Sequence, residues 1–254
     1  MAVALSHETE DGFRARDLSV SLGGRNVLRN VSLDVGHGSI LSVVGRSGAG
    51  KSTLLYALAG LIGYQGFVER PAKMSFVFQG YALFPWLTVR ENIAFAVRGG
   101  SREERASTVA RYLMRTGLVE HASKYPLQLS GGQTQRVAFA RALAAQADAV
   151  LLDEPFAALD EYTRVDMSAW LLEIWSESRP TIVLVTHNID EAVFLGDSVV
   201  VLSEGRIVHT ATPPFGRPRD RSIWRSESFF KLRSEILDYL GGDSKLGKNE
   251  EIPR

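Results

Sequence analysis

"SILSVVGRSGAGKSTLLYALAGL", residues 39–61, carries the clearest structural signal in this chain. It begins with an almost continuous apolar run rich in β-branched residues, the pattern of a strand buried on both faces. A glycine-rich turn follows, and the stretch ends in an apolar run of helical character. A buried strand that leads through glycines into a helix predicts a mostly parallel α/β sheet.

The turn itself, residues 45–52, fits the pattern G-x-x-x-x-G-K-[ST]. Its glycines let successive backbone N–H groups face one polyphosphate at the positive end of the helix. Lys51 can then reach the β- and γ-phosphates, and the Ser52 hydroxyl can bind Mg²⁺. The alternative, a glycine-rich turn with a chance lysine, is disfavoured by the matching strand and helix on either side. We therefore predict a nucleotide site built from Gly45, Arg46, Ser47, Gly48, Ala49, Gly50, Lys51, Ser52 and Thr53.

Patterns on both sides of this stretch divide the chain into parts. Apolar and polar residues alternate around Gly23–Gly24, which predicts paired antiparallel strands. After residue 148, buried strands alternate with helices, whereas residues 85–146 have helical character throughout. The predicted fold is an α/β domain with an antiparallel β subdomain and an inserted helical subdomain. Its predicted parts are a flexible N-terminus (1–15), the main domain (16–215), and a linker, amphipathic helix and polar tail (216–254).

Two adjacent acids, Asp153 and Glu154, end the apolar run "AVLLD". Ligand sites in parallel sheets lie at such carboxyl ends of strands. Asp153 is suited to the Mg²⁺ shell, and Glu154 is suited to orient and deprotonate an attacking water. Taken alone, an acidic pair here is equally consistent with a solvated loop start, but the phosphate loop favours the catalytic interpretation and indicates hydrolysis.

A second glycine-rich helix start, "LSGGQ" at residues 129–133, has no lysine of its own. One helix N-terminus can surround only one side of a phosphate, so a second one would neutralise charge from the far side. The alternative is an ordinary helix start capped by Ser130.

Together these three motifs resemble the ATP-binding cassette family, specifically the nucleotide-binding subunit of a transporter, over residues 16–210. The resemblance implies a P-loop NTPase core that hydrolyses ATP with Mg²⁺. It also implies that two cassettes pack head to tail, so that each closes its glycine segment over the ATP of the other. The residues that would act across the dimer are Ser130, Gly131, Gly132, Gln133 and Asp160.

Single positions carry the resemblance further. Gln79 in "FQG" resembles the glutamine that touches Mg²⁺ and the attacking water, and His187 in "VTHN" resembles the histidine that contacts the γ-phosphate. By themselves the two are also consistent with a polar strand end and an exposed histidine. Asp160 in "ALD" resembles the loop aspartate that reaches across the dimer, and it is equally suited to cap a helix. The implied metal ligands are Ser52, Gln79 and Asp153, and the implied catalytic residues are Glu154, His187 and Gln79.

One position departs from the family pattern. Where the family usually has an aromatic residue to stack on adenine, this chain has Leu22, which offers apolar contact but no ring face. Phe13 lies too early in the chain to replace it. The departure puts the strength of adenine binding in question.

The segments "FQGYALFPWLTVRENIAF" and "RPRDR" resemble importers of nitrate, sulfonates and taurine. The resemblance implies a second cassette subunit, either an identical chain, which we expect, or a different one. It also implies transmembrane permease subunits, an extracytoplasmic solute-binding protein, and a peripheral place on the cytoplasmic face of the inner membrane. For the C-terminal tail, which begins with the linker "RPRDR", we expect solvated arginines and a terminal helix with an apolar side packed on the main domain. That side would consist of Phe229, Phe230, Leu232, Ile236, Leu237 and Leu240.

Composition excludes other classes. The formal net charge is +0, which does not favour nucleic acid as a partner, and the absence of cysteine excludes disulfides and thiolate metal sites. The start has no signal-peptide pattern, and the apolar runs are strand-sized. Two rival functions remain: a soluble cassette-type regulator outside transport, and a P-loop kinase or GTPase, which would have no use for the second glycine segment.

Overall fold

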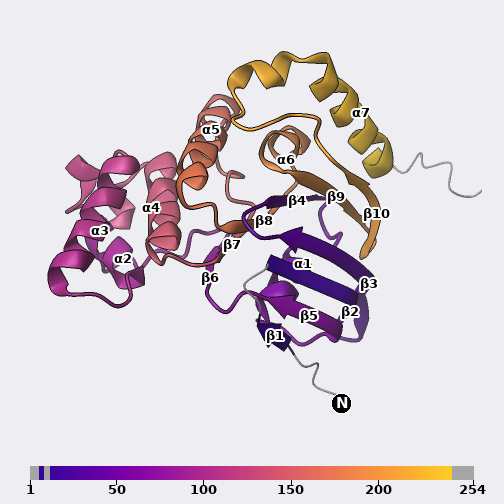
Figure 1. Cartoon of the computed structure of the whole chain (residues 1–254), viewed down its shortest axis with the longest axis horizontal. Helices are drawn as coiled ribbons and strands as arrows, with labels where there is room; N and C mark the ends of the chain where they lie inside the picture. The colour runs from indigo at the N-terminus through magenta and orange to yellow at the C-terminus, as the bar shows by residue number, and fades with distance from the viewer. Residues whose placement is uncertain (1–5, 9–11, 242–254) are drawn as a thin grey trace, which may run out of the picture.

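The computed structural model describes residues 6–8 and 12–241 and arranges them around two sheets (Figure 1). Strand β4 (Ile40–Val44) lies inside the larger sheet, whose order is β10-β9-β4-β8-β7-β6, and all five of its residues are buried. Its pairs with β8 and β9 are parallel, as are β8–β7 and β7–β6, and only β10 runs antiparallel to its neighbour. The predicted parallel sheet is confirmed. Its other strands are β6 (Met74–Val77), β7 (Ala149–Asp153), β8 (Thr181–Thr186), β9 (Ser198–Ser203) and β10 (Arg206–Ala211).

The second sheet has the order β1-β5-β2-β3 and is the predicted antiparallel subdomain, apart from the parallel pair β1–β5. Gly23 and Gly24 form the hairpin turn with φ of 56° and 79°, a left-handed conformation that glycine adopts without a steric cost. The strands are β1 (Ser6–Glu8), β2 (Gly12–Leu22), β3 (Arg25–Gly36) and β5 (Gln65–Arg70).

The structure differs from the flexible N-terminus predicted for residues 1–15. Residues 6–8 and 12–15 lie in β1 and β2, and Phe13 and Ala15 are buried opposite Val35 and Leu33. The start of β2 was not predicted because its composition is polar. Its charged side chains lie on the solvent face of the sheet, where Arg14 pairs with Glu69. The remainder of the predicted terminus, residues 1–5 and 9–11, lies outside the described residues.

Helices cover the large sheet, and a separate group of helices stands to one side of it (Figure 1). In that group, Thr88 and Ser101 each cap a helix through a reciprocal bond pair with a glutamate three residues on. The group is α2 (Val89–Ala96), α3 (Arg102–Arg115), η1 (Val119–His121), η2 (Pro126–Gln128) and α4 (Gly131–Ala144). The helices on the sheet are α1 (Lys51–Ala59), α5 (Glu161–Ser178) and α6 (Ile189–Leu195). Among the helices within residues 12–241, none combines the length and hydropathy needed to cross a membrane.

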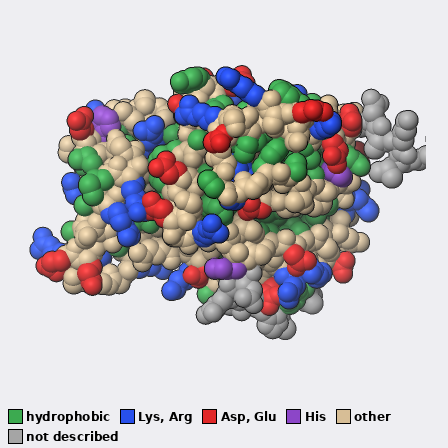
Figure 2. All heavy atoms as spheres, turned by 45° about the horizontal axis from the view of Figure 1, so that its top comes forward, with side chains coloured by type: hydrophobic (Ala, Val, Ile, Leu, Met, Phe, Trp, Pro, Cys, Tyr) green, Lys and Arg blue, Asp and Glu red, His purple; other side chains and the backbone are tan. Residues whose placement is uncertain are grey.

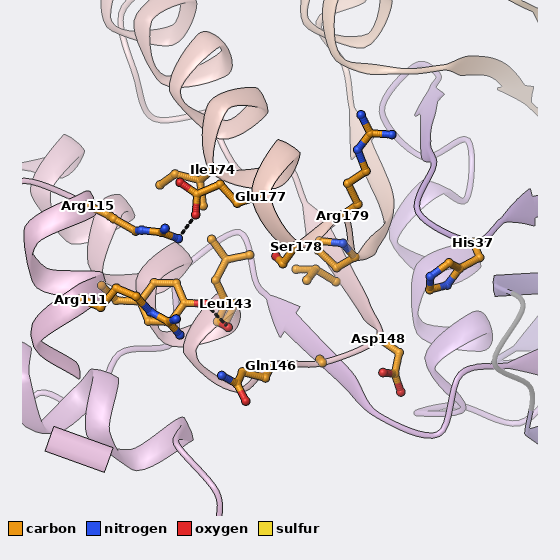
Figure 3. Close-up of a pocket in the computed structure, with 15 residues that line it drawn as sticks. His37, Arg111, Arg115, Leu143, Gln146, Asp148, Ile174, Glu177, Ser178 and Arg179 are labelled. Carbon is orange, nitrogen blue, oxygen red and sulfur yellow. Dashed lines mark hydrogen bonds and ion pairs between the residues drawn. The ribbon is translucent and has the colours of Figure 1, made fainter. Parts of the chain in front are cut away.

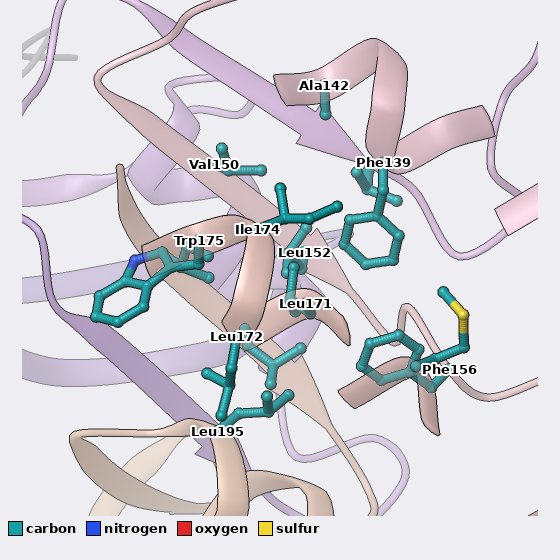
Figure 4. Close-up of a cluster of buried hydrophobic side chains, with 14 of the residues drawn as sticks. Phe139, Ala142, Val150, Leu152, Phe156, Leu171, Leu172, Ile174, Trp175 and Leu195 are labelled. Atoms are coloured by element: carbon teal, nitrogen blue, oxygen red, sulfur yellow. The ribbon is translucent and has the colours of Figure 1, made fainter. Parts of the chain in front are cut away.

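Apolar side chains fill the space on each side of the large sheet. The alternation of β4 sends Ile40 and Val44 to one cluster and Leu41 and Val43 to the other. In the first cluster, Phe139 of α4 stacks on Phe156 with ring centroids 5.7 Å apart (Figure 4). Side chains of this size each contribute about 1.5–3 kcal/mol when fully buried. This cluster joins the helical group to β7, α5 and α6.

The C-terminal part consists of η3 (Arg221–Arg225) and α7 (Glu227–Gly241). Only one face of α7 packs on the main domain as predicted. Phe229, Leu232 and Ile236 are buried, but Phe230 and Leu237 lie on the other face and are exposed, contrary to the expectation. The expected solvation of the linker arginines was also wrong for Arg217 and Arg219, whose side chains are 18% and 1% exposed. The predicted polar tail from residue 242 onward lies outside the described residues. The face shown in Figure 2 intersperses acidic, basic and hydrophobic side chains, so neither sign of charge dominates it.

Candidate nucleotide site

The glycine loop between β4 and α1 has a backbone that requires glycine. Gly48 and Gly50 have φ of 81° and 102°, and a Cβ on Gly45 would lie 2.4 Å from the carbonyl oxygen of Leu202. Gly50 stands at the N-cap of α1, and no side chain caps it. The N-terminal N–H groups of α1 therefore face the loop without a side-chain acceptor, as a phosphate site requires.

Lys51 is buried and folds back over this loop. Its Nζ donates to the carbonyl oxygens of Gly45 (3.0 Å) and Arg46 (3.4 Å) and lies 3.5 Å from Oε1 of Glu154. The ammonium group thus stands at the mouth of the loop, at the positive end of α1, where a polyphosphate would lie.

Asp153 is buried at the end of β7 and accepts two hydrogen bonds. The Ser52 hydroxyl donates to Oδ1 (2.9 Å), and the Tyr56 hydroxyl donates to Oδ2 (3.0 Å). Burial, and then the charge of Asp153, raises the pKa of Tyr56. Sequence reasoning missed Tyr56, although it lies four residues after Ser52 on α1 and so on the same helix face.

The oxygens of Ser52 and Asp153 fit Mg²⁺, which prefers hard oxygen ligands and retains several waters. Within residues 6–8 and 12–241 no group of three or more acidic, histidine or cysteine side chains gathers at one point. The donor set therefore suits an ion that takes its remaining ligands from phosphate and water.

Adjacent strand ends bring Glu154 and His187 together. Asp153 pairs with Val185 in the β7–β8 register, so the residues that follow the two strands are neighbours, and His187 Nδ1 lies 2.7 Å from Glu154 Oε2. Glu154 has a φ of 45°, and its N–H donates to the carbonyl oxygen of Val185. A non-glycine residue in this left-handed region costs roughly 1–3 kcal/mol, the kind of local strain that concentrates at functional sites.

Gln79 joins the same cavity from the end of β6, because β6 lies next to β7 in the sheet. The cavity has a volume of about 530 Å³. It is lined by Val27, Ser47, Gly48, Gly50, Lys51, Ser52, Thr53, Gln79, Glu154 and His187. Residues predicted from four separate segments thus meet at one edge of the sheet. Val27 was not predicted, and it is the apolar wall of the cavity; Leu22, 47% exposed at the hairpin end, is not part of the lining.

The second glycine segment lies outside this cavity and caps α4. The Ser130 hydroxyl accepts from the N–H of Gln133 (3.3 Å), and Oε1 of Gln133 accepts from the N–H of Ser130 (3.0 Å). Ser130 is thus the N-cap of α4, as in the alternative interpretation of this segment, and the predicted role toward a second cassette stays a prediction. Among the described residues, a Cβ on Gly131 would meet nothing within 4 Å, and one on Gly132 would meet only a methyl group of Thr163 at 3.9 Å. The packing of this chain therefore does not require either glycine, although glycine in a helix costs about 1 kcal/mol relative to alanine.

Asp160, also outside the cavity, is the N-cap of α5. Its carboxylate accepts from the Thr163 N–H (2.9 Å) and hydroxyl (2.7 Å), and these bonds lower the pKa of Asp160. Because Thr163 also lies beside Gly132, the starts of α4 and α5 form one continuous surface.

A second cavity, of about 440 Å³, contains arginines but suits phosphate poorly (Figure 3). Arg115 is paired with Glu177, and the guanidinium of Arg111 lies over the ring of Tyr112. The cavity is bordered by the C-terminal ends of α4 and α5, whose carbonyl groups repel anions. The cavity at Lys51 is the better phosphate site.

Comparison with known proteins identifies the family. The family model for the ABC transporter matches residues 28–157. The aliphatic sulfonates import ATP-binding protein SsuB 3 of Nocardia farcinica is 42% identical, covering 92% of this chain and 93% of that protein. The taurine import ATP-binding protein TauB of Chromobacterium violaceum is 44% identical, covering 83% and 87%. The bicarbonate transport ATP-binding protein CmpD of Synechocystis sp. is 40% identical, covering 86% and 83%.

A solved structure agrees with these relatives. The dimeric post-hydrolysis state of the ATP-binding cassette MJ0796 bound to ADP and Pi matches with a TM-score of 0.71 and 32% identity, covering 80% of this chain and 100% of that chain. The glycine loop, the acidic strand end and the capped glycine segment all lie in the part of the chain that the family model matches. This chain belongs to the ABC transporter family, of which it is an ATP-binding domain.

Proposed function

We propose that this chain is the ATP-hydrolysing subunit of an importer for a small anion, and that it works as a homodimer. The names of its relatives support this proposal, because they refer to the import of sulfonates and taurine and to the transport of bicarbonate. These solutes are small and carry an anionic or zwitterionic oxyacid group. The relatives differ in solute, so the solute class is proposed only at this level.

The observation that carries the dimer is the pair of glycines at the start of α4. The packing of the described residues does not require Gly131 or Gly132, and none of their atoms lies within 4 Å of a Cβ placed on Gly131. A close approach from outside the chain is the remaining reason for glycine at this point. A second copy would bring its Lys51 loop, with ATP, to this surface, and Asp160 would meet the same loop.

The chemistry then divides among the residues of the cavity. Lys51 and the N-terminal N–H groups of α1 would hold the phosphates, and Ser52 and Asp153, with Gln79, would hold Mg²⁺. Mg²⁺, when bound, would neutralise phosphate charge. Glu154 would orient and deprotonate the attacking water, and His187 would hold Glu154 in place and contact the γ-phosphate.

We propose that the permease binds in an apolar groove beside Gln79. This groove has a volume of about 680 Å³ and lies between β6 and the helical group. Its aromatic lining consists of Phe76, Phe78, Phe84 and Phe95. Phe95 is 66% exposed, and Trp86, close by, is 69% exposed. Exposed apolar surface of this kind favours a protein partner. The permease would hold the chain at the cytoplasmic face of the inner membrane, with an extracytoplasmic protein delivering the solute.

Coexpression with a candidate permease from the same organism tests the proposal. We expect the complex to purify from detergent and, in proteoliposomes, to take up a sulfonate or taurine only with ATP. Phe95→Asp should abolish copurification, whereas Phe230→Asp, at a residue of α7 that is 57% exposed, should not. A chain that never copurifies with a membrane protein would instead favour a regulator outside transport.

A further inference from the structure

We infer that the C-terminal segment, residues 213–241, is a positioning element for His187 and acts through α6. The inference deepens the proposed function, because it concerns the regulation of the same site. It rests on contacts that the segment makes at both ends of α6.

His187 is placed directly by α6. It precedes Asn188, the N-cap of this seven-residue helix, whose side chain accepts from the N–H of Glu191. The body of α6 is buried, with Ala192, Val193, Phe194 and Leu195 each 0% exposed. A short, rigid helix of this kind moves as one body, so a shift along its axis changes the 2.7 Å contact between His187 and Glu154.

Two arginines of the segment hold the C-terminal end of α6. Arg219 donates to the carbonyl oxygens of Phe194 (2.7 Å), Gly196 (2.8 Å) and Val193 (3.2 Å). Arg217 donates to the carbonyl oxygen of Leu195 (2.6 Å) and to Asp197 (2.8 Å). These bonds satisfy helix carbonyls that otherwise lack partners. Burial lowers the pKa of Arg219 to about 10, so the group keeps its charge at neutral pH.

A third arginine reaches the opposite end. Arg233 of α7 donates to Oδ1 of Asp190, in the first turn of α6, at 2.6 Å. Near the C-terminal end of α6, the ring centroids of Trp224 and Phe194 are 4.9 Å apart. The segment therefore contacts α6 at both of its ends.

These contacts do more than bury the helix. Apolar packing is non-directional, whereas guanidinium groups bonded to carbonyls at one end and to a carboxylate at the other are directional contacts that define the position of the helix along its axis. A displacement of about 1 Å in a catalytic group is enough to cost rate.

Substitutions at the two ends test the inference in the full-length chain. Arg233→Gln should lower kcat for ATP hydrolysis by at least about threefold while leaving the Kd for a fluorescent ATP analogue unchanged, because the Lys51 loop is not touched. Arg233→Lys should restore kcat, since a single ammonium can replace this one bond. Arg217→Lys, by contrast, should still lower kcat, because one ammonium group cannot make the forked contacts of Arg217 to Leu195 and Asp197.

Lys231→Gln is the matched control, because Lys231 lies on α7 but pairs with Glu227 of the same helix. It should leave kcat and Kd at parent values, and thermal unfolding should show every variant folded. Equal losses of kcat and ATP affinity, or an unchanged kcat in Arg233→Gln, would overturn the inference. Both readouts use ATP alone, so a failure to transport a given solute would count against the proposed function and not against this inference.

Discussion

The ammonium group of Lys51 lies 3.5 Å from Oε1 of Glu154, so the phosphate-binding lysine and the proposed base form an ion pair. The other oxygen of this carboxylate bonds His187 at 2.7 Å. Lys51 is 6% exposed and Glu154 17%, so the pair is largely shielded from water. A phosphate group in the loop would compete with Glu154 for the Lys51 ammonium, so we expect phosphate binding to weaken this ion pair.

Glu154→Gln should therefore abolish turnover without loss of ATP binding. We expect kcat to fall by roughly 10²–10⁴-fold, the contribution of a general base, and ATP to bind at least as tightly because the ion pair to Lys51 is gone. Single-turnover hydrolysis and gel filtration with ATP would measure both, with a stable ATP-bound dimer expected. Glu173→Gln, on the exposed face of α5, serves as the control. Hydrolysis by the Glu154 variant at the parent rate would refute its role as base.

Ser130→Arg and Lys51→Ala should each be inactive alone and active when mixed. In a head-to-tail dimer, a mixed pair contains one site with an intact Lys51 and an intact Ser130. Random pairing limits the recovered rate to about a quarter of the parent rate. Steady-state ATPase assays of the two variants, alone and mixed, would measure this. If mixing recovers nothing while each variant still folds, the two residues do not belong to a shared site.

Tyr56→Phe should weaken the response to Mg²⁺. The Tyr56 hydroxyl holds one oxygen of Asp153 while Ser52 contacts the other, and loss of such a supporting bond typically lowers metal affinity about 10–100-fold. A titration of ATPase activity with Mg²⁺ should show a higher half-maximal concentration at nearly unchanged maximal rate. An unchanged titration curve would mean that the Tyr56 bond does not orient Asp153.

Leu22→Tyr should strengthen ATP binding. Leu22 is 47% exposed at the end of β2, and a ring there could stack on adenine for about 0.5–1.5 kcal/mol, or roughly two- to tenfold in Kd. Leu61→Tyr, at a leucine that is 58% exposed after α1, controls for added aromatic surface. Calorimetry with ATP and with GTP would compare the variants. Equal effects of both substitutions on ATP binding would show that the side chain at position 22 does not face the adenine ring.

Glu191→Gln should change the pH dependence of stability. Burial raises the pKa of Glu191 to about 8, although its hydrogen bond from Thr186 opposes the shift. Between about pH 4.5 and 8 the folded chain holds a proton that the unfolded chain has released, so this group costs stability as pH rises, by up to about 1.4 kcal/mol per pH unit. The variant should match the parent near pH 4.5 and exceed it at pH 8 in urea unfolding. A constant difference across that range would mean that Glu191 is ionised in the folded state.

Local patterns were enough to predict much of the fold and of the cavity. The glycine loop, the buried strand before it and the acids after "AVLLD" each depend on residues close together in the chain, where strand burial, glycine conformation and helix start have direct sequence signatures. The N-caps at Ser130 and Asp160 followed from the same kind of local rule.

Contacts between distant segments were decided only by the tertiary structure. The strand at residues 12–15 was missed because its burial depends on pairing with β3, and the burial of Arg217 and Arg219 depends on where α6 ends. From the sequence alone, a charged residue is predicted to be exposed to solvent. The carbonyl groups that will accept its hydrogen bonds cannot be located without the fold. The nucleotide loop, the acidic strand end and the second glycine-rich helix start were all predictable from local sequence patterns. The sheet order β6-β7-β8 and the register of Asp153 with Val185 decided that Gln79, Glu154 and His187 meet Lys51 in one cavity, because strand pairing brings remote strand ends to one edge.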